Sequence, residues 1–179
     1  MTIIDHKELG LEIYENYISD NEHSLLIEEL ASEFIKHGSN APGPGYMNRN
    51  QVIRYGDISM CENNHAGTIF PINMDQISNK LVDSGILKYK PDTVNINEYL
   101  KGNFIRPHID RVASGPIVTI LSLKSTAKMI FTSGKKTFDL ILLPKMLIQM
   151  KNSIRWHWHH SIEPVEDTRY SIVFRNKNE

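Results

Sequence analysis

Apolar residues recur at intervals of three and four along the chain after Ser19, which is the spacing of an amphipathic helix. Glu22 follows Ser19 at the distance at which two side chains cap each other's free backbone amides, and Gly38 stands where such a helix ends. The pattern therefore predicts a helix over residues 20–37. The same periodicity predicts a second helix over Met74–Asp83.

The pattern changes from residue 92 onward to short apolar and β-branched runs separated by turn residues, which is typical of antiparallel sheets. The eight runs are Thr93–Tyr99, Phe104–Asp110, Ile117–Leu123, Lys128–Thr132, Lys136–Leu143, Met146–Met150, Ile154–Ile162 and Tyr170–Phe174. Eight strands suit a jelly roll made of two sheets. The predicted fold class is therefore mainly β, with flanking helices around a jelly-roll core.

A single domain is expected for residues 1–179, because no linker, repeat or low-complexity tract divides the sequence. About residues 1–90 are expected to supply the helices, and about residues 91–179 the jelly-roll core. Between Gly38 and Asn50 the chain has two prolines and three glycines, which predict a long surface loop.

Composition and charge exclude several classes of protein. The 179 residues are 40% hydrophobic and 23% charged, as in ordinary globular domains, and the net charge of −1 gives no global basic field for nucleic acid. Cys61 has no second cysteine to pair with, no apolar run approaches the roughly 18 residues that span a bilayer, and the first ten residues lack the apolar core of a signal peptide. We expect a monomeric cytoplasmic protein, or a nuclear one in a eukaryote, without a membrane partner.

Candidate metal ligands begin with His108 and Asp110, which alternate along one predicted strand and therefore face the same way. An imidazole and a carboxylate on one face are able to hold a divalent metal. Taken alone, the pair is weak evidence, because a histidine beside an aspartate is common on protein surfaces.

A second cluster, Arg155-Trp156-His157-Trp158-His159-His160-Ser161-Ile162, offers three further histidines. Alternation along a strand places His160 on the same face as the tryptophans, which we expect to point inward. With His108 and Asp110, an inward His160 completes two histidines and a carboxylate, the set used by non-haem Fe(II) oxygenases. His157 and His159 stay open as alternative ligands, and a core histidine without a metal is the competing interpretation.

A third feature is the last predicted strand, in which Arg169 and Arg175 share one parity. Forked guanidinium donors suit a co-substrate with two carboxylates, although two solvated arginines fit the same spacing. Asn97 and Tyr99 share a face on an earlier strand and offer an amide and a hydroxyl, unless Tyr99 is simply an aromatic at the edge of the core.

Taken together, Asn97-x-Tyr99, His108-x-Asp110, the run from Arg155 to Ile162 and Arg169-x5-Arg175 stand in one order over about 80 residues. This order resembles the AlkB family of Fe(II)- and 2-oxoglutarate-dependent dioxygenases, whose pattern reads N-x-Y, H-x-D, R-x-x-W-x-H-x-I and R-x5-R. A looser similarity covers Gly10–Glu29.

The resemblance implies a double-stranded β-helix in which His108, Asp110 and His160 bind Fe(II). It implies that Arg169, helped by Tyr99, binds the distal carboxylate of 2-oxoglutarate, while Asn97 and Arg175 lie near the end that chelates the metal. With O2, such an enzyme converts 2-oxoglutarate to succinate and CO2 and hydroxylates a C–H bond of the substrate. Many repair members have Asn at the position of Ser171, so this chain departs from the bacterial repair enzyme there.

The resemblance also implies that a lid over the substrate, at about Gly38 to Gly56, precedes the barrel. This stretch contains Tyr46, Arg49, Arg54 and Tyr55, which are suited to stacking and phosphate contact, although a solvated loop would have the same composition. A local basic rim would come from further cations, namely Lys88, Lys90, Lys101, Arg106 and Arg111.

These residues support oxidative demethylation of an N-methylated nucleobase in DNA or RNA as the leading hypothesis. The near-neutral charge, the short chain and Ser171 support an alternative, a hydroxylase or demethylase of protein side chains such as methyl-lysine. A non-catalytic binding module is a third hypothesis, against which the complete set of candidate ligands argues.

Overall fold

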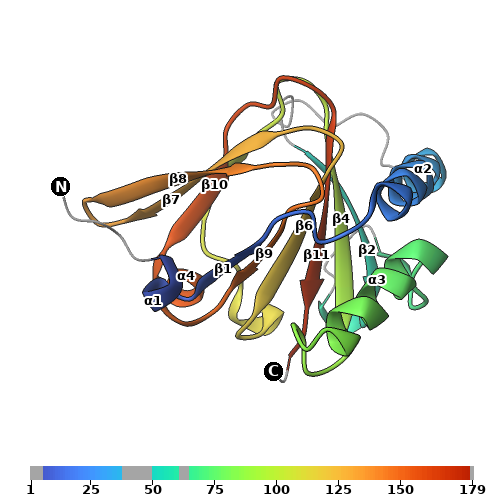
Figure 1. The fold of residues 1–179 in the computed structure, drawn as a ribbon, viewed down its shortest axis with the longest axis horizontal. Coiled ribbons are helices and arrows are strands. Elements are labelled where there is room, and N and C mark those ends of the chain that lie inside the picture. Colours follow the sequence, from blue (N-terminus) through green and yellow to red (C-terminus); the bar gives the residue numbers. More distant parts are fainter. Residues whose placement is uncertain (1–5, 38–49, 61–64, 178–179) are drawn as a thin grey trace.

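Two β-sheets face each other in the computed structural model, which describes residues 6–37, 50–60 and 65–177 (Figure 1). The larger sheet has the strand order β1-β9-β6-β11-β4-β2-β3 and the smaller sheet the order β5-β10-β7-β8. Every pair of neighbouring strands is antiparallel except β2 and β3. The predicted fold class, mainly β with a jelly-roll core, is confirmed.

The strands of the larger sheet are β1 (Leu11–Tyr14), β2 (Gln51–Gly56), β3 (His65–Gly67), β4 (Thr93–Tyr99), β6 (Val118–Leu123), β9 (Leu147–Met150) and β11 (Arg169–Arg175). The smaller sheet contains β5 (Ile105–His108), β7 (Ala127–Ser133), β8 (Lys136–Leu142) and β10 (His159–Ile162). The helices are α1 (His6–Leu9), α2 (Asp20–His37), α3 (Ile72–Asp83) and α4 (Asn152–His157), with 3-10 turns η1 (Ile58–Met60) and η2 (Val112–Ser114). None of the helices in the described ranges is long and apolar enough to cross a membrane.

Helices α2 and α3 cover the outer face of the larger sheet (Figure 1). Helix α2 spans the predicted residues 20–37, and its start is capped reciprocally: the Ser19 amide donates to Glu22 Oε2 over 2.7 Å and the Glu22 amide donates to Ser19 Oγ over 3.2 Å. Leu26 and Leu30 of α2 belong to the same buried core cluster as Ile172 of β11, and all three side chains are fully buried.

Alternation along β11 divides its side chains between two environments. Tyr170, Ile172 and Phe174 point to the helices and join the first core cluster. Val173 belongs to a second cluster between the two sheets, and Arg169 lines a cavity there. The larger sheet is therefore apolar on its helix side and carries polar groups on the side that faces the smaller sheet, as predicted for this strand.

The segment 154–162 differs from its prediction. It forms helix α4 up to His157 and then strand β10, where a single strand was expected. Arg155, which the strand pattern placed outside, is only 2% exposed, whereas Trp156 is partly exposed. A helix of six residues is too short for its apolar spacing to be told from strand alternation, which explains the error.

Candidate metal and co-substrate site

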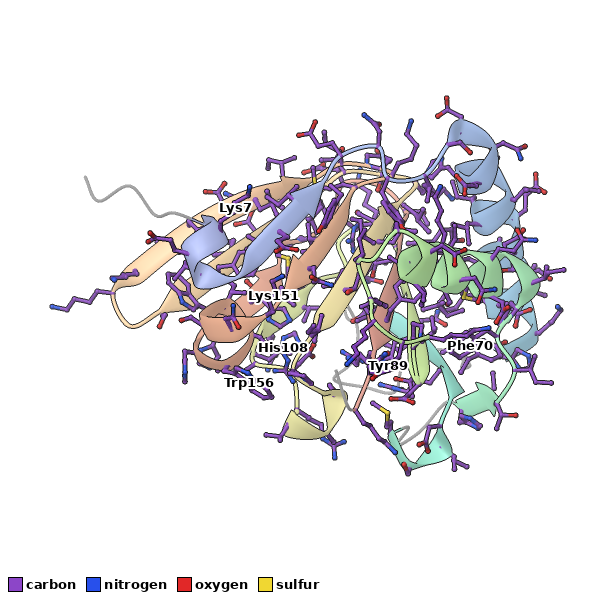
Figure 2. The ribbon with its side chains drawn as sticks, turned by 60° about the horizontal axis from the view of Figure 1, so that its bottom comes forward. Lys7, Phe70, Tyr89, His108, Lys151 and Trp156 are labelled. Atoms are coloured by element: carbon purple, nitrogen blue, oxygen red, sulfur yellow. The ribbon has the colours of Figure 1, made fainter. Side chains whose placement is uncertain are left out.

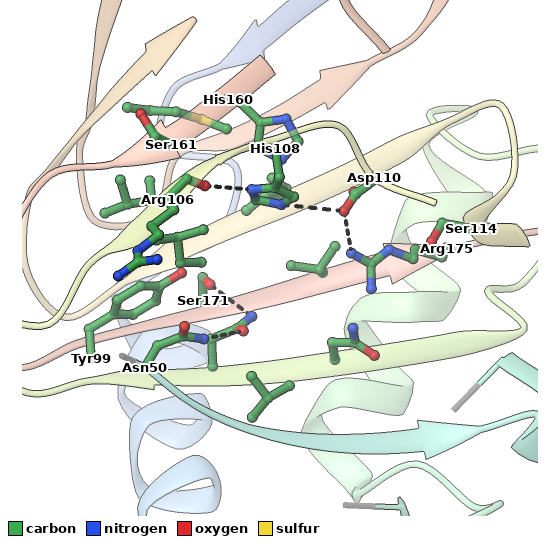
Figure 3. A pocket seen from close by; sticks show the side chains of 18 of the residues that line it. Asn50, Tyr99, Arg106, His108, Asp110, Ser114, His160, Ser161, Ser171 and Arg175 are labelled. Atoms are coloured by element: carbon green, nitrogen blue, oxygen red, sulfur yellow. Dashed lines mark hydrogen bonds and ion pairs between the residues drawn. The ribbon is translucent and has the colours of Figure 1, made fainter. Parts of the chain in front are cut away.

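The two histidines and the aspartate predicted as metal ligands meet between the sheets. His160 on β10 pairs directly with His108 on β5, and their ring centroids are 4.3 Å apart. Asp110 lies two residues beyond His108, just past the end of β5, and one ligand atom from each of the three residues lies within 4.8 Å of the others (Figure 3). Two imidazoles and one carboxylate in this arrangement leave further coordination positions open, as Fe(II) oxygenation requires.

The other two histidines of the cluster lie elsewhere. His157 ends helix α4 and His159 begins β10, and both side chains are exposed, whereas His160 is only 8% exposed. Side chains alternate along β10, so His159 faces away from the side on which His160 meets His108. The structure therefore places His160, and neither alternative, next to His108 and Asp110.

Hydrogen bonds prepare His108 for metal binding. Its Nδ1 lies 2.9 Å from the Arg106 carbonyl oxygen, which only accepts, so Nδ1 carries the hydrogen and Nε2 is left for a metal (Figure 3). Burial by itself lowers the pKa of His108, but the Asp110 carboxylate, with an oxygen 3.7 Å from Nε2, raises that pKa overall. A divalent ion in this position would replace that proton.

The other two groups are held in the protonation states that bind metal. Burial lowers the pKa of His160 to about 4, helped by the neighbouring His108, so the ring is neutral near pH 7. Burial alone would raise the pKa of Asp110, but the Arg175 guanidinium, 3.1 Å from its Oδ1, and then His108 hold that pKa well below its usual range. A neutral imidazole beside an ionised carboxylate fits a divalent cation.

A buried arginine lies elsewhere in the same cavity. Arg169 is 1% exposed, its Nε and Nη2 contact Ser122 Oγ at 3.3 and 3.2 Å, and its guanidinium carbon lies 4.8 Å from the centre of the Tyr99 ring. Its Nη1 is buried and has no hydrogen-bond partner among the described residues. A buried guanidinium with an unused donor fits an anionic acceptor such as a carboxylate.

Strand β4 lines this cavity with Asn95, Asn97 and Tyr99, as expected for alternating positions. Asn97 Nδ2 donates to Ser171 Oγ over 3.2 Å, and Asn50 Nδ2 donates to Asn97 Oδ1 over 2.8 Å (Figure 3). Ser171, where the family pattern often has Asn, therefore accepts a hydrogen bond that fixes the orientation of the Asn97 amide.

Arg155 is a supporting residue that strand reasoning placed wrongly. Its Nε donates to the Gly115 carbonyl over 3.0 Å, Nη1 to the Asp110 carbonyl over 3.0 Å, and Nη2 to the Arg111 carbonyl over 2.7 Å. Helix α4, which carries Arg155, lies on the same side of the molecule as His108 and away from α2 and α3 (Figure 2). Its place in the R-x-x-W-x-H-x-I pattern is the only sequence signal for this role.

Of the two described residues that were predicted to contact substrate, one lines the cavity and the other does not. Arg54 on β2 lines the cavity, whereas Tyr55, its neighbour, is 4% exposed on the opposite face, packs against the helices and donates its hydroxyl to Glu33. Tyr55 is therefore a core residue, because alternation along β2 turns it away from the site. Tyr46 and Arg49 lie outside the described residues.

The predicted basic rim is only partly present. Arg106 and Arg111 line the cavity, which has a volume of about 480 Å³. Lys88, Lys90 and Lys101 do not line it, and Lys90 forms an ion pair with Asp75 of helix α3, 2.5 Å away.

Comparisons with known proteins agree with this geometry. The profile of the family described as the 2OG-Fe(II) oxygenase superfamily matches residues 10–175. Uncharacterized protein L905 of Acanthamoeba polyphaga mimivirus is 28% identical over 183 residues, which cover 93% of this chain and 84% of that protein. The tRNA (carboxymethyluridine(34)-5-O)-methyltransferase ALKBH8 of Macaca fascicularis is 29% identical over 161 residues, or 86% of this chain and 24% of that protein.

Solved structures share the fold at low sequence identity. OsALKBH1 superposes with a TM-score of 0.72 and 14% identity, covering 93% of this chain and 98% of that one. A prolyl-4-hydroxylase of Pseudomonas putida superposes with a TM-score of 0.69 and 16% identity, covering 96% of each chain. The chain corresponds to about a quarter of the length of ALKBH8, so the activity of that whole protein does not pass to it directly.

Proposed function

The chain belongs to the 2OG-Fe(II) oxygenase superfamily, and on that premise we propose that it removes an N-methyl group from a nucleobase of DNA or RNA by oxidation. The enzyme class, an Fe(II)- and 2-oxoglutarate-dependent dioxygenase, follows from the family. One observation supports the proposal most strongly. The candidate metal ligands His108, Asp110 and His160 line the same cavity as Arg169, whose buried Nη1 has no hydrogen-bond partner among the described residues.

The donor set fits the cofactors of this class. His108, Asp110 and His160 would hold Fe(II), because two neutral imidazoles and a carboxylate are the ligands that non-haem iron takes in oxygenases. Arg169 would bind the distal carboxylate of 2-oxoglutarate with its unused Nη1, beside Tyr99. Asn97 would donate to the other end of the co-substrate, and Arg175 would reach the same end while holding Asp110.

When bound, iron with 2-oxoglutarate and O2 supplies the oxidising power, and 2-oxoglutarate becomes succinate and CO2. The protein's own residues position the reactants and keep water out. Arg175 holds Asp110 in its ionised form, the Arg106 carbonyl fixes the ring of His108, and apolar residues line the cavity between the sheets, namely Ile120, Met129, Leu142, Ile162 and Val173. A substrate N–CH3 group gains one oxygen, and the resulting N–CH2OH group breaks into N–H and formaldehyde.

Two observations support a nucleic-acid substrate. Arg54, Arg106 and Arg111 are among the residues that line the cavity, and guanidinium groups suit phosphates. The similar ALKBH8 proteins act on tRNA by their names. A methyl-lysine substrate is supported less well, because Tyr99 is the only Phe, Tyr or Trp in the lining among the described residues, and a trimethylammonium site is normally an aromatic cage.

The test is succinate release by the iron-loaded protein, with His160→Ala as the inactive control. Methylated DNA, methylated RNA and methyl-lysine peptides are compared at saturating 2-oxoglutarate. We expect a methylated oligonucleotide to raise succinate release above the rate without substrate. The formaldehyde formed should equal the additional succinate. Stimulation by the peptide alone would favour the protein demethylase, and the absence of iron-dependent turnover with all of them would favour a binding module.

A further inference from the structure

A row of polar side chains crosses the cavity wall that belongs to the larger sheet. Strand register places Asn97 of β4 opposite Ser171 of β11, and both residues line the cavity with exposures of only 7% and 2%. Asn50, which directly precedes β2, extends the row, because its Nδ2 donates to Asn97 Oδ1 over 2.8 Å (Figure 3). Asn50 belongs to none of the sequence motifs, yet it contacts a residue that would bind the co-substrate.

The hydrogen bonds of this row run in one direction. Asn50 donates to Asn97 Oδ1, and Asn97 Nδ2 donates to Ser171 Oγ over 3.2 Å. An amide carries two hydrogens on its nitrogen and none on its oxygen, so the partner of the oxygen decides how the amide is turned. With Oδ1 held by Asn50, one Nδ2 hydrogen is donated to Ser171, and the second can be donated to an acceptor in the cavity.

The other end of the row favours the same direction. Arg169 has donors and no acceptor, and its guanidinium carbon lies 4.8 Å from the centre of the Tyr99 ring. Burial raises the pKa of Tyr99, whereas the charge of Arg169 and hydrogen bonds from Ser171 and Arg169 lower it in part. Because Ser171 gives its single hydroxyl hydrogen to Tyr99, it offers Asn97 a lone pair.

The direction matters because an ionised carboxylate only accepts hydrogen bonds. Arg169, Tyr99 and Asn97 all line the cavity, and in this direction each presents a donor to a carboxylate of 2-oxoglutarate. If the Asn97 amide were turned over, its oxygen would replace its donor and repel the carboxylate. Asn50 opposes that change by occupying the amide oxygen.

We infer that Asn50 is a positioning residue for 2-oxoglutarate, whose side chain donates to Asn97 Oδ1 and thereby presents Asn97 to the co-substrate as a donor. The inference rests on the role proposed for Asn97, and it is independent of the substrate that is oxidised. It adds a residue next to β2 to a co-substrate site that is otherwise built from β4 and β11.

Two variants separate loss of this hydrogen bond from its reversal. Asn50→Leu has a similar shape and no polar group, so the Asn97 amide loses the partner that orients it. Asn50→Asp has nearly the same shape and only accepts, so it should attract Asn97 Nδ2 and turn the amide over. We expect the Kd for 2-oxoglutarate to rise about threefold in Asn50→Leu and at least about tenfold in Asn50→Asp. The measurement is calorimetry with Zn²⁺-loaded protein, which does not turn over.

Kinetics of the iron enzyme give a second readout, namely succinate release without a second substrate. We expect Asn50→Asp to raise the KM for 2-oxoglutarate and to leave kcat within about twofold, because Asn50 acts on binding of the co-substrate. The Kd for Zn²⁺ should stay unchanged in both variants. A merely structural role would instead change kcat and metal affinity together with the KM, and this result would overturn the inference.

A double-mutant cycle with Asn97→Ala tests whether Asn50 acts through Asn97. Asn97→Ala alone should raise the Kd for 2-oxoglutarate about tenfold. In that background Asn50→Asp should add less than about twofold, because no amide is left to turn. Repulsion of the anionic co-substrate by the new charge would persist in that background, so the cycle separates orientation from charge.

Asn103→Asp is the matched control for an exchange of amide for carboxylate. Asn103 Oδ1 accepts from the Leu100 amide in a turn outside the cavity lining, and an aspartate retains that bond. Its Kd for 2-oxoglutarate should equal that of the original protein, and thermal unfolding verifies that every variant folds.

An unchanged Kd in Asn50→Asp, or an increase of equal size with and without the Asn97 amide, would overturn the inference while the role of Asn97 stands. An unchanged Kd in Asn97→Ala would remove the proposed role of Asn97 and this inference with it. The demethylase function is tested separately, because these assays contain no nucleic acid.

Discussion

Arg155→Met tests whether the hydrogen bonds of the Arg155 side chain fix the position of the backbone segment that carries Asp110. The change keeps most of the apolar stem and removes donors to the carbonyls of Asp110, Arg111 and Gly115. The bond to Gly115 is buried, so losing it leaves an unsatisfied carbonyl that costs about 1–3 kcal/mol. The other two carbonyls are part-buried and regain some hydration, at about 0.5–1 kcal/mol each.

The total, about 3 kcal/mol, corresponds to a fall in Tm of about 10 °C for a chain of this length. Because Asp110 is a candidate metal ligand, its looser backbone should also weaken metal binding by about 10- to 100-fold, the usual effect of losing a group that orients a ligand. The assays are thermal unfolding without metal and calorimetric titration with Zn²⁺ at a temperature where the variant is folded. Arg155→Lys should recover part of the affinity, since an ammonium reaches one carbonyl.

Leu30→Ala is the control for general destabilisation. Leu30 of α2 is fully buried and lies far in the chain from the metal cluster, and its truncation costs a similar 2–5 kcal/mol. We expect it to lower the Tm comparably and to leave the Kd for Zn²⁺ unchanged. Wild-type metal affinity in Arg155→Met, or an equal loss of affinity in Leu30→Ala, would refute the positioning argument.

Three further changes have defined outcomes. Arg169→Met should raise the KM for 2-oxoglutarate at least about tenfold in steady-state kinetics, because it removes the buried guanidinium that would bind the distal carboxylate of the co-substrate. Burial by itself raises the pKa of Glu33, but hydrogen bonds, led by the one from Tyr55, lower this pKa below its ordinary value of 4.5. The ionised Glu33 therefore stabilises the fold above pH 4.5, and this stabilisation is lost as the pH falls through the pKa of Glu33 in the folded protein. Glu33→Gln should accordingly make the free energy of unfolding, measured by urea titration, less dependent on pH below about pH 4.5. Gly115→Ala should lower the Tm by several degrees, because φ is +80° and the new Cβ would lie 1.6 Å from the Asn176 carbonyl oxygen.

Sequence periodicity was sufficient where an element is long and one of its faces is apolar. Helix α2 and strand β4 occupy the predicted residues, since both alternate clearly between core and polar positions. Strand β2 was missed because the family resemblance assigned about Gly38 to Gly56 to a lid, and the proline- and glycine-rich run before the strand predicted a loop. The alternation of Arg54 and Tyr55 along β2 contains the information that one faces the cavity and the other the core.

The metal ligands can be predicted from the sequence, whereas the residues that position those ligands are much harder to predict. A ligand is constrained by its own chemistry, so His108, Asp110 and His160 are detectable by residue type, order and parity. A supporting residue such as Arg155 is constrained by backbone carbonyls that lie 40 to 45 positions away in the chain and carry no side-chain signature. Only the tertiary fold brings that guanidinium to those carbonyls, and there it determines where the Asp110 carboxylate stands. The identity of a site can thus be found from its ligands, whereas its precision depends on contacts that become visible only in the folded chain.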